Sequence, residues 1–135
     1  MTRKRVLVAD DITPVLSTVA ALLRESFDVV GTVSDGRAAL QATLKLRPDL
    51  VVLDISMPLM SGIEVAAELT RQGSKAKIVF LTVHEDQDIL NTCRAAGGLG
   101  YVIKVLMDTD LVPAMNEALA GQTFSSCFPS QEDMP

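Results

Sequence analysis

Short apolar runs recur along the chain, and stretches in which apolar residues have a helical spacing separate them. Each run is four to six residues long, rich in Val, Ile and Leu, and nearly continuous. Continuous runs of this length are typical of strands that are buried on both faces. The clear runs are residues 5–10, 50–53, 77–81 and 100–103, and residues 27–31 form a weaker fifth candidate at a sheet edge.

The segments between these runs carry helix signals. Hydroxyl-bearing residues, which can accept hydrogen bonds from the free amides of a first helical turn, precede three of them. A Pro follows the first such residue, and Glu64 follows Ser61 at the spacing of a capping box. The predicted helices follow the caps Thr13, Ser34 and Ser61, and two more cover residues 85–96 and 108–120.

The order of elements is therefore a strand followed by a helix, repeated five times. This alternation predicts an α/β fold with a parallel sheet and helices on both of its faces. Residues 122–135 lose the apolar periodicity and gain Ser, Pro and acidic residues. We therefore expect a single domain over residues 1–121, followed by a tail or the start of a linker.

Polar side chains follow four of the predicted strands at the point where each strand ends. Asp10 and Asp11 follow the first run, Asp54 the third, Thr82 the fourth and Lys104 the last. Parallel strands place their carboxyl ends along one edge of the sheet, where ligands of open α/β sheets bind. The pattern predicts that these five side chains converge there.

Three carboxylates and one ammonium would leave a net negative charge at that edge. Two like charges about 4 Å apart repel by about 4 kcal/mol at an effective dielectric constant of about 20. Such a cluster must take up protons or bind a cation, and its oxygen ligands favour Mg²⁺ or Mn²⁺ over zinc. His84, the only histidine, is interpreted as a loop residue and not as a metal ligand. A carboxylate beside a divalent cation is a suitable nucleophile toward phosphorus.

Composition narrows the remaining classes. The chain has 135 residues, 12 Lys and Arg, 17 Asp and Glu, and a net charge of −5. This length suits one domain, and the acidic total argues against a surface for nucleic acid. No apolar run approaches the ~20 residues that span a bilayer. Cys93 and Cys127 lack the spacing of a metal site, so we expect reduced cysteines and a cytoplasmic protein.

Four phrases of the sequence, in this order, resemble the receiver domains of bacterial two-component response regulators. They are VLVADD (6–11), VVLDISMPLMSG (51–62), IVFLTVHED (78–86) and GYVIK (100–104). The likeness covers roughly residues 3–121, and it is greatest to receivers that precede a LuxR-type helix-turn-helix domain. The resemblance implies a flavodoxin-like (βα)5 doubly wound sheet with strand order 2-1-3-4-5.

The resemblance also implies a phosphorylation site that depends on magnesium. Asp54 would be the phosphoacceptor, taking a phosphoryl group from the phosphohistidine of a sensor histidine kinase. Asp11 would bind Mg²⁺ directly and Asp10 through water. The backbone carbonyl of Ser56 would complete the metal shell together with Asp54.

Three further roles follow from the same resemblance. Thr82 would form a hydrogen bond to the bound phosphoryl group, and Lys104 would pair with its oxygens. Tyr101 would be the aromatic switch that turns inward when Thr82 moves. Residues 85–120 would form the face that transmits the signal.

The implied protein is a signalling module and not a turnover enzyme. Its partners would be the kinase and, after phosphorylation, a second copy of the chain, with DNA contacted only through an output domain absent from these residues. One alternative is a single-domain receiver that acts through protein–protein interaction, and another is a docking-only relative. A dehalogenase-type phosphatase is disfavoured because Ser56 stands where a second acid is needed. A nucleotide- or flavin-binding protein is disfavoured because acids follow the first strand.

Two positions depart from the commonest receiver pattern. Val83 replaces the frequent Ala after Thr82, and a larger side chain there would slow hydrolysis of an acyl phosphate. Val105 replaces a frequent Pro, so the sequence leaves open whether the peptide bond between Lys104 and Val105 is cis.

Overall fold

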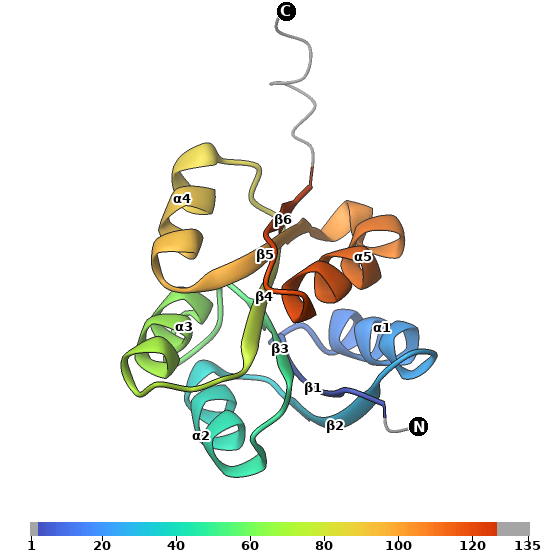
Figure 1. Cartoon of the computed structure of the whole chain (residues 1–135), viewed down its shortest axis with the longest axis horizontal. Helices are drawn as coiled ribbons and strands as arrows, with labels where there is room; N and C mark the ends of the chain where they lie inside the picture. Colours follow the sequence, from blue (N-terminus) through green and yellow to red (C-terminus); the bar gives the residue numbers. More distant parts are fainter. Residues whose placement is uncertain (1–2, 127–135) are drawn as a thin grey trace, which may run out of the picture.

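The computed structural model describes residues 3–126, which form a six-stranded sheet flanked by helices (Figure 1). The elements in chain order are β1 (Arg5–Ala9), α1 (Thr13–Arg24), β2 (Asp28–Val33), α2 (Gly36–Leu46), β3 (Leu50–Asp54), α3 (Gly62–Arg71), β4 (Lys77–Thr82), α4 (Gln87–Ala95), β5 (Gly98–Ile103), the 3-10 turn η1 (Lys104–Leu106), α5 (Met107–Leu119) and β6 (Phe124–Ser125). All strand pairs are parallel, in the order β2-β1-β3-β4-β5-β6. The predicted α/β class and the order 2-1-3-4-5 are confirmed.

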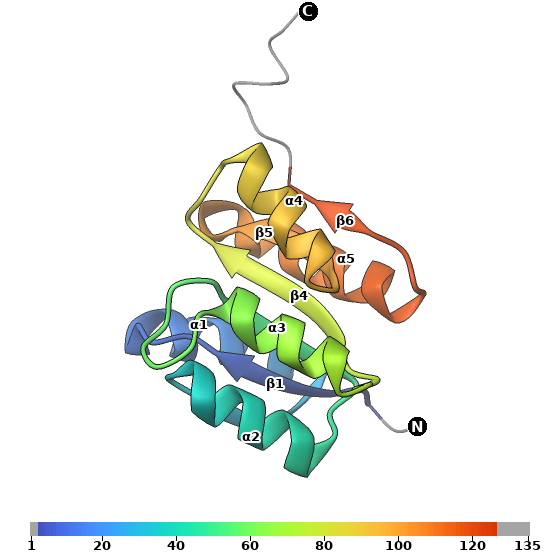
Figure 2. The same cartoon turned by 90° about the vertical axis from the view of Figure 1, so that its left-hand side faces the viewer.

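Helices cover both faces of the sheet, in three layers. Helices α1 and α5 lie on one face, and α2, α3 and α4 lie on the other (Figures 1 and 2). None of the helices in the described part of the chain is long and apolar enough to cross a membrane. From β1 the chain adds β2 on one side of the sheet and then β3, β4, β5 and β6 on the other, so the strand order changes direction between β1 and β3. Ligands of open α/β sheets bind at the carboxyl ends of the strands beside such a point, which is where the site is expected.

The core is divided by the sheet into two apolar clusters. Alternate residues of each strand point to opposite faces, so Leu7 and Val51 pack toward α2–α4 while Val6 and Val52 pack toward α1 and α5. Every residue of β3 is buried. This two-sided burial is the reason that the strand runs are continuously apolar and not alternating.

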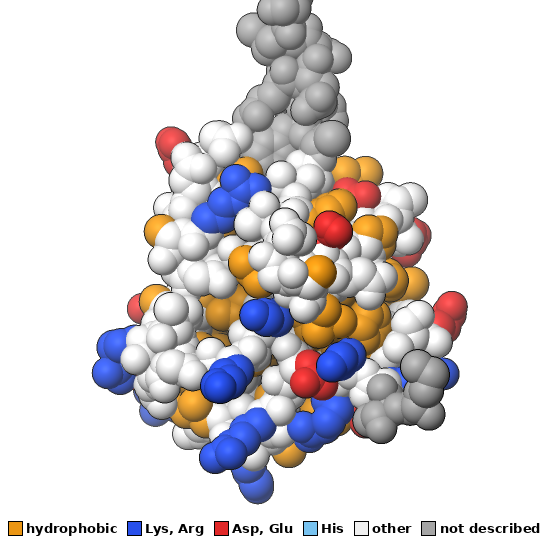
Figure 3. All heavy atoms as spheres, in the orientation of Figure 1, with side chains coloured by type: hydrophobic (Ala, Val, Ile, Leu, Met, Phe, Trp, Pro, Cys, Tyr) orange, Lys and Arg blue, Asp and Glu red, His pale blue; other side chains and the backbone are white. Residues whose placement is uncertain are grey.

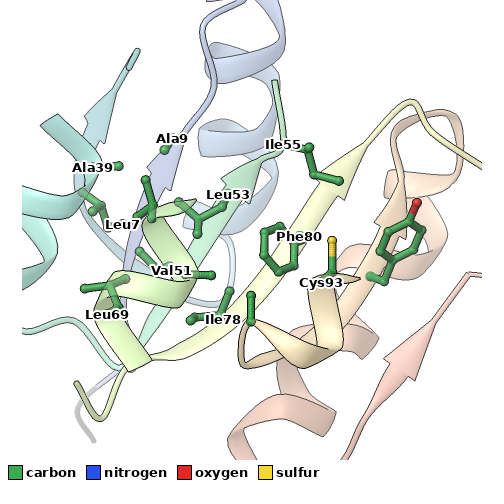
Figure 4. Packing of buried hydrophobic residues seen from close by; sticks show 14 of the residues in the cluster. Leu7, Ala9, Ala39, Val51, Leu53, Ile55, Leu69, Ile78, Phe80 and Cys93 are labelled. Carbon is green, nitrogen blue, oxygen red and sulfur yellow. The ribbon is translucent and has the colours of Figure 1, made fainter. Parts of the chain in front are cut away.

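The larger cluster lies beneath α2, α3 and α4 (Figure 4). Leu69 of α3 and Cys93 of α4 pack against strand residues that include Val51, Ile78 and Phe80. Burial raises the pKa of the Cys93 thiol to about 12, so this side chain acts as a small apolar residue. Cys93 is a free cysteine, as predicted, and Cys127 lies outside the described residues.

The helix starts agree with the sequence signals in part. The predicted cap at Thr13 is wrong, because Thr13 is the first residue of α1 and Ile12 precedes it without a side-chain cap. The capping box between Ser61 and Glu64 is present, and both of its hydrogen bonds form. The predicted cap at Ser34 is wrong, because the carboxylate of Asp35 accepts a hydrogen bond of 2.7 Å from the amide of Ala38. A carboxylate one residue later reaches the first-turn amides equally well, and sequence spacing alone does not separate the two.

The sheet extends beyond the segment predicted to hold it. Strand β6 lies within residues 122–135, which were expected to form a tail or linker, and it pairs with β5 through Gly100 and Tyr101. The boundary at residue 121 stays a prediction, and residues 127–135 lie outside the described part. A sixth strand is thus added at the β5 edge (Figures 1 and 2).

Basic side chains gather at the opposite end of the strands from the predicted site. The helices run antiparallel to the strands, so their C-terminal ends lie where the strands begin, and cations are favoured there by the helix dipole. Basic residues in these last turns are Arg24, Lys45, Arg71 and Arg94. A groove of about 630 Å³ is lined by Lys4, Arg47, Lys75 and Lys77, among other residues. Figure 3 shows one face on which Lys and Arg crowd the lower half.

Candidate functional site

The carboxyl ends of the central strands bring together the side chains that the sequence predicted to converge. Asp10 and Asp11 follow β1, and Asp54 is the last residue of β3. One carboxylate oxygen from each of the three lies within 4.8 Å of the others. Asp10 and Asp54 are buried, whereas Asp11 is exposed, so the cluster opens to solvent on the side of Asp11.

Lys104 supplies a cation to this cluster. Its Nζ lies 2.9 Å from Oδ2 of Asp10 and 3.6 Å from Oδ1 of Asp54. The other carboxylate oxygen of Asp10, Oδ1, accepts a hydrogen bond of 2.9 Å from the amide of Ile12. Oδ2 of Asp10 is buried and accepts no hydrogen bond of good geometry. The lysine charge is therefore the main compensation for Asp10, and it compensates Asp54 only in part.

The environment of Asp54 disfavours its charged form. Burial and the neighbouring Asp10 carboxylate raise the pKa of Asp54 to about 6, against the opposing effect of Lys104. The Asp11 charge raises this pKa further, and a hydrogen bond from the backbone of Ser56 lowers it. One ammonium is thus too little charge for three carboxylates. The surplus of hard oxygen donors fits a divalent cation such as Mg²⁺.

We expect Asp54→Asn to stabilise the fold in EDTA, because it removes a buried charge that the protein compensates incompletely. The folded-state pKa of about 6 lies above the ordinary 3.8, so the folded chain holds this proton more tightly than the unfolded chain. The resulting stability is present below pH 3.8 and lost as the pH rises through 6. The advantage of the variant should therefore grow across that window and then level off, at no more than about 3 kcal/mol.

Urea unfolding at several pH values measures this difference. Asp28→Asn is the matched control, because Asp28 is an exposed acid at the start of β2, away from the carboxylate cluster. An Asp54→Asn chain that is less stable than wild type in EDTA at pH 8 would show that the buried charge is well compensated.

Thr82 and Tyr101 both hold the loop that follows β4. The hydroxyl of Thr82 accepts a hydrogen bond of 3.1 Å from the amide of His84, and the hydroxyl of Tyr101 donates one of 2.8 Å to the carbonyl of His84. Both side chains are buried. Burial, and then the neighbouring Cys93, raise the pKa of Tyr101 to about 12, so the phenol keeps its proton and remains a donor. The tyrosine ring is already inside the protein in this structure.

The loop after Asp54 approaches the site closely. Gly62 donates a hydrogen bond of 2.8 Å to the carbonyl of Ile55, and a Cβ at this glycine would overlap the carbonyl oxygen of Asp54. Ser56 is exposed, and its amide bonds the carboxylate of Asp54. The predicted metal-ligating role of the Ser56 carbonyl stays a prediction.

The peptide bond between Lys104 and Val105 is trans, as are all peptide bonds in residues 3–126. The chain continues from Lys104 into the turn η1, which leads directly into α5. The side chain of Val105 is exposed. The position that holds a frequent proline in the receiver pattern is thus a solvent-facing residue of a 3-10 turn.

Two polar residues that the sequence did not single out join the end of β5. Ser126 is 4% exposed, and its hydroxyl bonds both Ile103 and Asp110. A two-residue strand followed by a serine has no periodicity that could have revealed this contact. The sequence predicts only that Asp110 lies within the helix of residues 108–120.

Comparison with known proteins places these features in one family. The family model described as "Response regulator receiver domain" matches residues 6–116. The transcriptional regulatory protein PdtaR of Mycobacterium tuberculosis is 35% identical over 118 residues, covering 87% of this chain and 57% of that protein. The chain therefore spans little more than half the length of this curated relative.

Two solved receivers share the fold closely. The signal receiver domain of the NarL response regulator from Mycobacterium tuberculosis has a TM-score of 0.86 and 29% identity, and the match covers 90% of this chain and all of that one. The isolated receiver of RcsB from Salmonella enterica serovar Typhimurium, solved in the presence of phosphomimetic BeF3−, has a TM-score of 0.85 and 27% identity. That match covers 96% of this chain and 98% of the RcsB chain.

Proposed function

Because the chain belongs to the response regulator receiver domain family, we propose that Asp54 accepts a phosphoryl group from the phosphohistidine of a sensor histidine kinase. The single observation that carries this proposal is the cluster of Asp10, Asp11 and Asp54 beside Lys104. A carboxylate placed beside a cation site and an ammonium is suited to attack phosphorus. The phosphomimetic used with the RcsB receiver agrees with the same chemistry.

The residues at the site fit one divalent cation. Asp10, Asp11 and Asp54, with the backbone carbonyl of Ser56, would hold Mg²⁺ or Mn²⁺. When bound, the ion would neutralise charge on the carboxylates and on the incoming phosphoryl oxygens. The surplus of carboxylates over the single Lys104 supports this assignment.

The transfer step needs an ionised nucleophile and a stabilised phosphoryl group. An oxygen of Asp54 forms the bond to phosphorus, the P–N bond to the donor histidine breaks, and its electron pair stays on the imidazole, which takes up a proton. Lys104 pairs with the phosphoryl oxygens, and the hydroxyl of Thr82 donates a hydrogen bond to one of them. The charged form of Asp54 is disfavoured in the protein alone, and a cation held by the neighbouring carboxylates would favour this ionised form.

The phosphoryl group would act as a switch and not as a step of turnover. It carries a charge of about −1.5 to −2, in place of the single charge of the Asp54 carboxylate, at the ends of β3, β4 and β5. Thr82 and Tyr101 both bond the loop after β4, so a change at Thr82 would reach α4 and the outer surface of β5. Self-association through this surface, with control of transcription through a LuxR-type DNA-binding domain, is the output that we propose for the full-length protein.

The test is to incubate the chain with acetyl phosphate and Mg²⁺ and to record its intact mass. We expect one phosphoryl adduct with Mg²⁺ and none with EDTA. A wild-type chain that takes up no phosphoryl group under these conditions would contradict the proposal and favour a docking-only domain.

Val83 offers a further prediction about the lifetime of the adduct. It directly follows Thr82, and its side chain is 66% exposed at the carboxyl edge of the sheet. Val83→Ala would open a path for water, and we expect hydrolysis to become about threefold faster, which is less than 1 kcal/mol in the barrier. Loss of the adduct is timed by mass, with Leu44→Ala on α2 as a control that keeps the wild-type rate. An unchanged lifetime in Val83→Ala would remove any role of this side chain in water access.

A further inference from the structure

Ser126, the residue after strand β6, forms hydrogen bonds to the last residues of β5. The hydroxyl of Ser126 accepts a hydrogen bond of 3.1 Å from the amide of Ile103 and donates one of 2.7 Å to the carboxylate of Asp110. The amide of Ser126 donates a hydrogen bond of 2.9 Å to the carbonyl of Tyr101. These bonds connect the C-terminal segment to both β5 and α5.

The hydroxyl replaces a strand partner that the sheet does not supply at this point. The pairing of β5 with β6 covers Gly100 and Tyr101 and stops there. Ile103 is 2% exposed, so its amide would be left buried without an acceptor if the hydroxyl were removed. Asp110 fixes the orientation of the hydroxyl, because its carboxylate accepts the hydrogen bond that the hydroxyl donates, and the oxygen lone pairs of Ser126 then face the amide of Ile103.

Ile103 directly precedes the lysine of the phosphorylation site. The backbone of Lys104 therefore leaves β5 from a residue whose amide is tied to Ser126. Lys104 reaches back to Asp10 and Asp54 from this point. The position of the end of β5 therefore affects the position of the Lys104 ammonium relative to Asp10 and Asp54.

We propose that Ser126, oriented by Asp110, is a positioning residue for Lys104, so that the segment 123–126 is a working part of the phosphorylation site. This inference rests on the proposed function of Asp54. It assigns to the C-terminal segment a role that the periodicity of the chain does not indicate. The segment contributes no group that touches the phosphoryl oxygens.

The sign of the coupling follows from this arrangement. Docking of Ser126 holds Lys104 in the geometry that a phosphoryl group requires. Coupling between two sites is reciprocal, so a phosphoryl mimic at Asp54 should tighten the docking of residues 124–126. The coupling should be positive in both directions.

The first experiment compares phosphorylation rates of variants of the 135-residue chain with acetyl phosphate and Mg²⁺. We expect Ser126→Ala to be phosphorylated about fivefold more slowly, at the low end of typical coupling effects, and Asp110→Ala to behave similarly. Ser125→Ala is the adjacent control, since no hydrogen bond is made by that side chain in the described residues. Thr43→Ala removes another buried hydroxyl, on α2, and controls for general destabilisation.

The second experiment has a readout that a merely structural role would not move. Hydrogen exchange is measured with and without beryllofluoride. In wild type, the mimic should increase protection of the amides of Ile103, Lys104 and residues 124–126, and in Ser126→Ala this increase at residues 124–126 should be lost. Amides of α2 should respond equally in both proteins.

Two results would overturn the inference while leaving the proposed function intact. One is a Ser126→Ala chain that is phosphorylated at the wild-type rate. The other is a wild-type chain that takes up the phosphoryl group but loses protection at residues 124–126 when beryllofluoride binds. A wild-type chain that cannot be phosphorylated at all would instead overturn the assignment of Asp54 and this inference with it.

Discussion

Asp54→Ala should form no phosphoryl adduct under conditions in which the wild-type chain is fully modified. The carboxylate oxygen of Asp54 is the proposed nucleophile, and alanine has no atom that can form the bond to phosphorus. The loss should be complete within the sensitivity of intact-mass analysis, at least about 1000-fold in rate, because removing a nucleophile removes the reaction path. This is the largest effect that we expect from any single substitution.

The control for this variant is Asp28→Ala, an exposed acid at the start of β2 that should keep the wild-type adduct. Circular dichroism should show that Asp54→Ala remains folded, since removal of a poorly compensated buried charge does not weaken the core. An adduct of undiminished yield on Asp54→Ala would mean that another side chain is the phosphoacceptor, and it would remove the basis for the proposed function.

Gly62→Ala should both destabilise the fold and slow phosphorylation. A Cβ at Gly62 would overlap the carbonyl oxygen of Asp54 and press on Ile55. Backbone atoms cannot move aside as a flexible side chain can, so we expect a loss of about 3 kcal/mol in the free energy of unfolding, near the upper end of overpacking costs. The same displacement shifts Asp54 relative to Lys104, and the phosphorylation rate should fall at least about tenfold.

Gly31→Ala separates this effect from the general cost of replacing a glycine. The nearest atom to a Cβ at Gly31 is Cδ1 of the Leu7 side chain, at 3.1 Å, which can adjust. We expect Gly31→Ala to lose less than about 1 kcal/mol and to be phosphorylated normally. Urea unfolding and the acetyl phosphate assay measure both proteins. Equal losses in the two variants would show that the overlap with Asp54 is relieved by local movement.

The convergence of polar side chains at the strand ends could be predicted from the sequence, because the topology of the sheet determines it. Once five apolar runs alternate with helices, a parallel sheet follows, and Asp10, Asp54 and Thr82 must end at one edge. The position of the Lys104 ammonium between the carboxylates of Asp10 and Asp54 could not be predicted from the sequence. Its Nζ lies closer to Asp10 than to Asp54 by 0.7 Å, from 2.9 Å and 3.6 Å, and this depends on where β5 ends and how the turn after it is held.

Two other features escaped prediction for reasons of local chemistry. Asp35 and Ser34 are adjacent and both are good caps, so only the backbone angles decide between them. The pairing of β6 depends on contacts between Phe124 and residues more than twenty positions earlier in the chain. A strand of two residues has too little pattern to indicate its register. The contact of Ser126 with Ile103 therefore appears only when the fold is assembled.

The separation of charge along the strands has a consequence for encounters between molecules. Five strand residues span about 17 Å, which is about twice the Debye length of about 8 Å at physiological ionic strength. An approaching partner near the carboxylates of Asp10 and Asp54 is therefore screened from the groove lined by Lys4 and Lys75 at the other end. The net charge of −5 therefore describes neither the acidic end nor the basic end of the strands. The rate at which a charged partner binds should depend on which of these two ends it approaches.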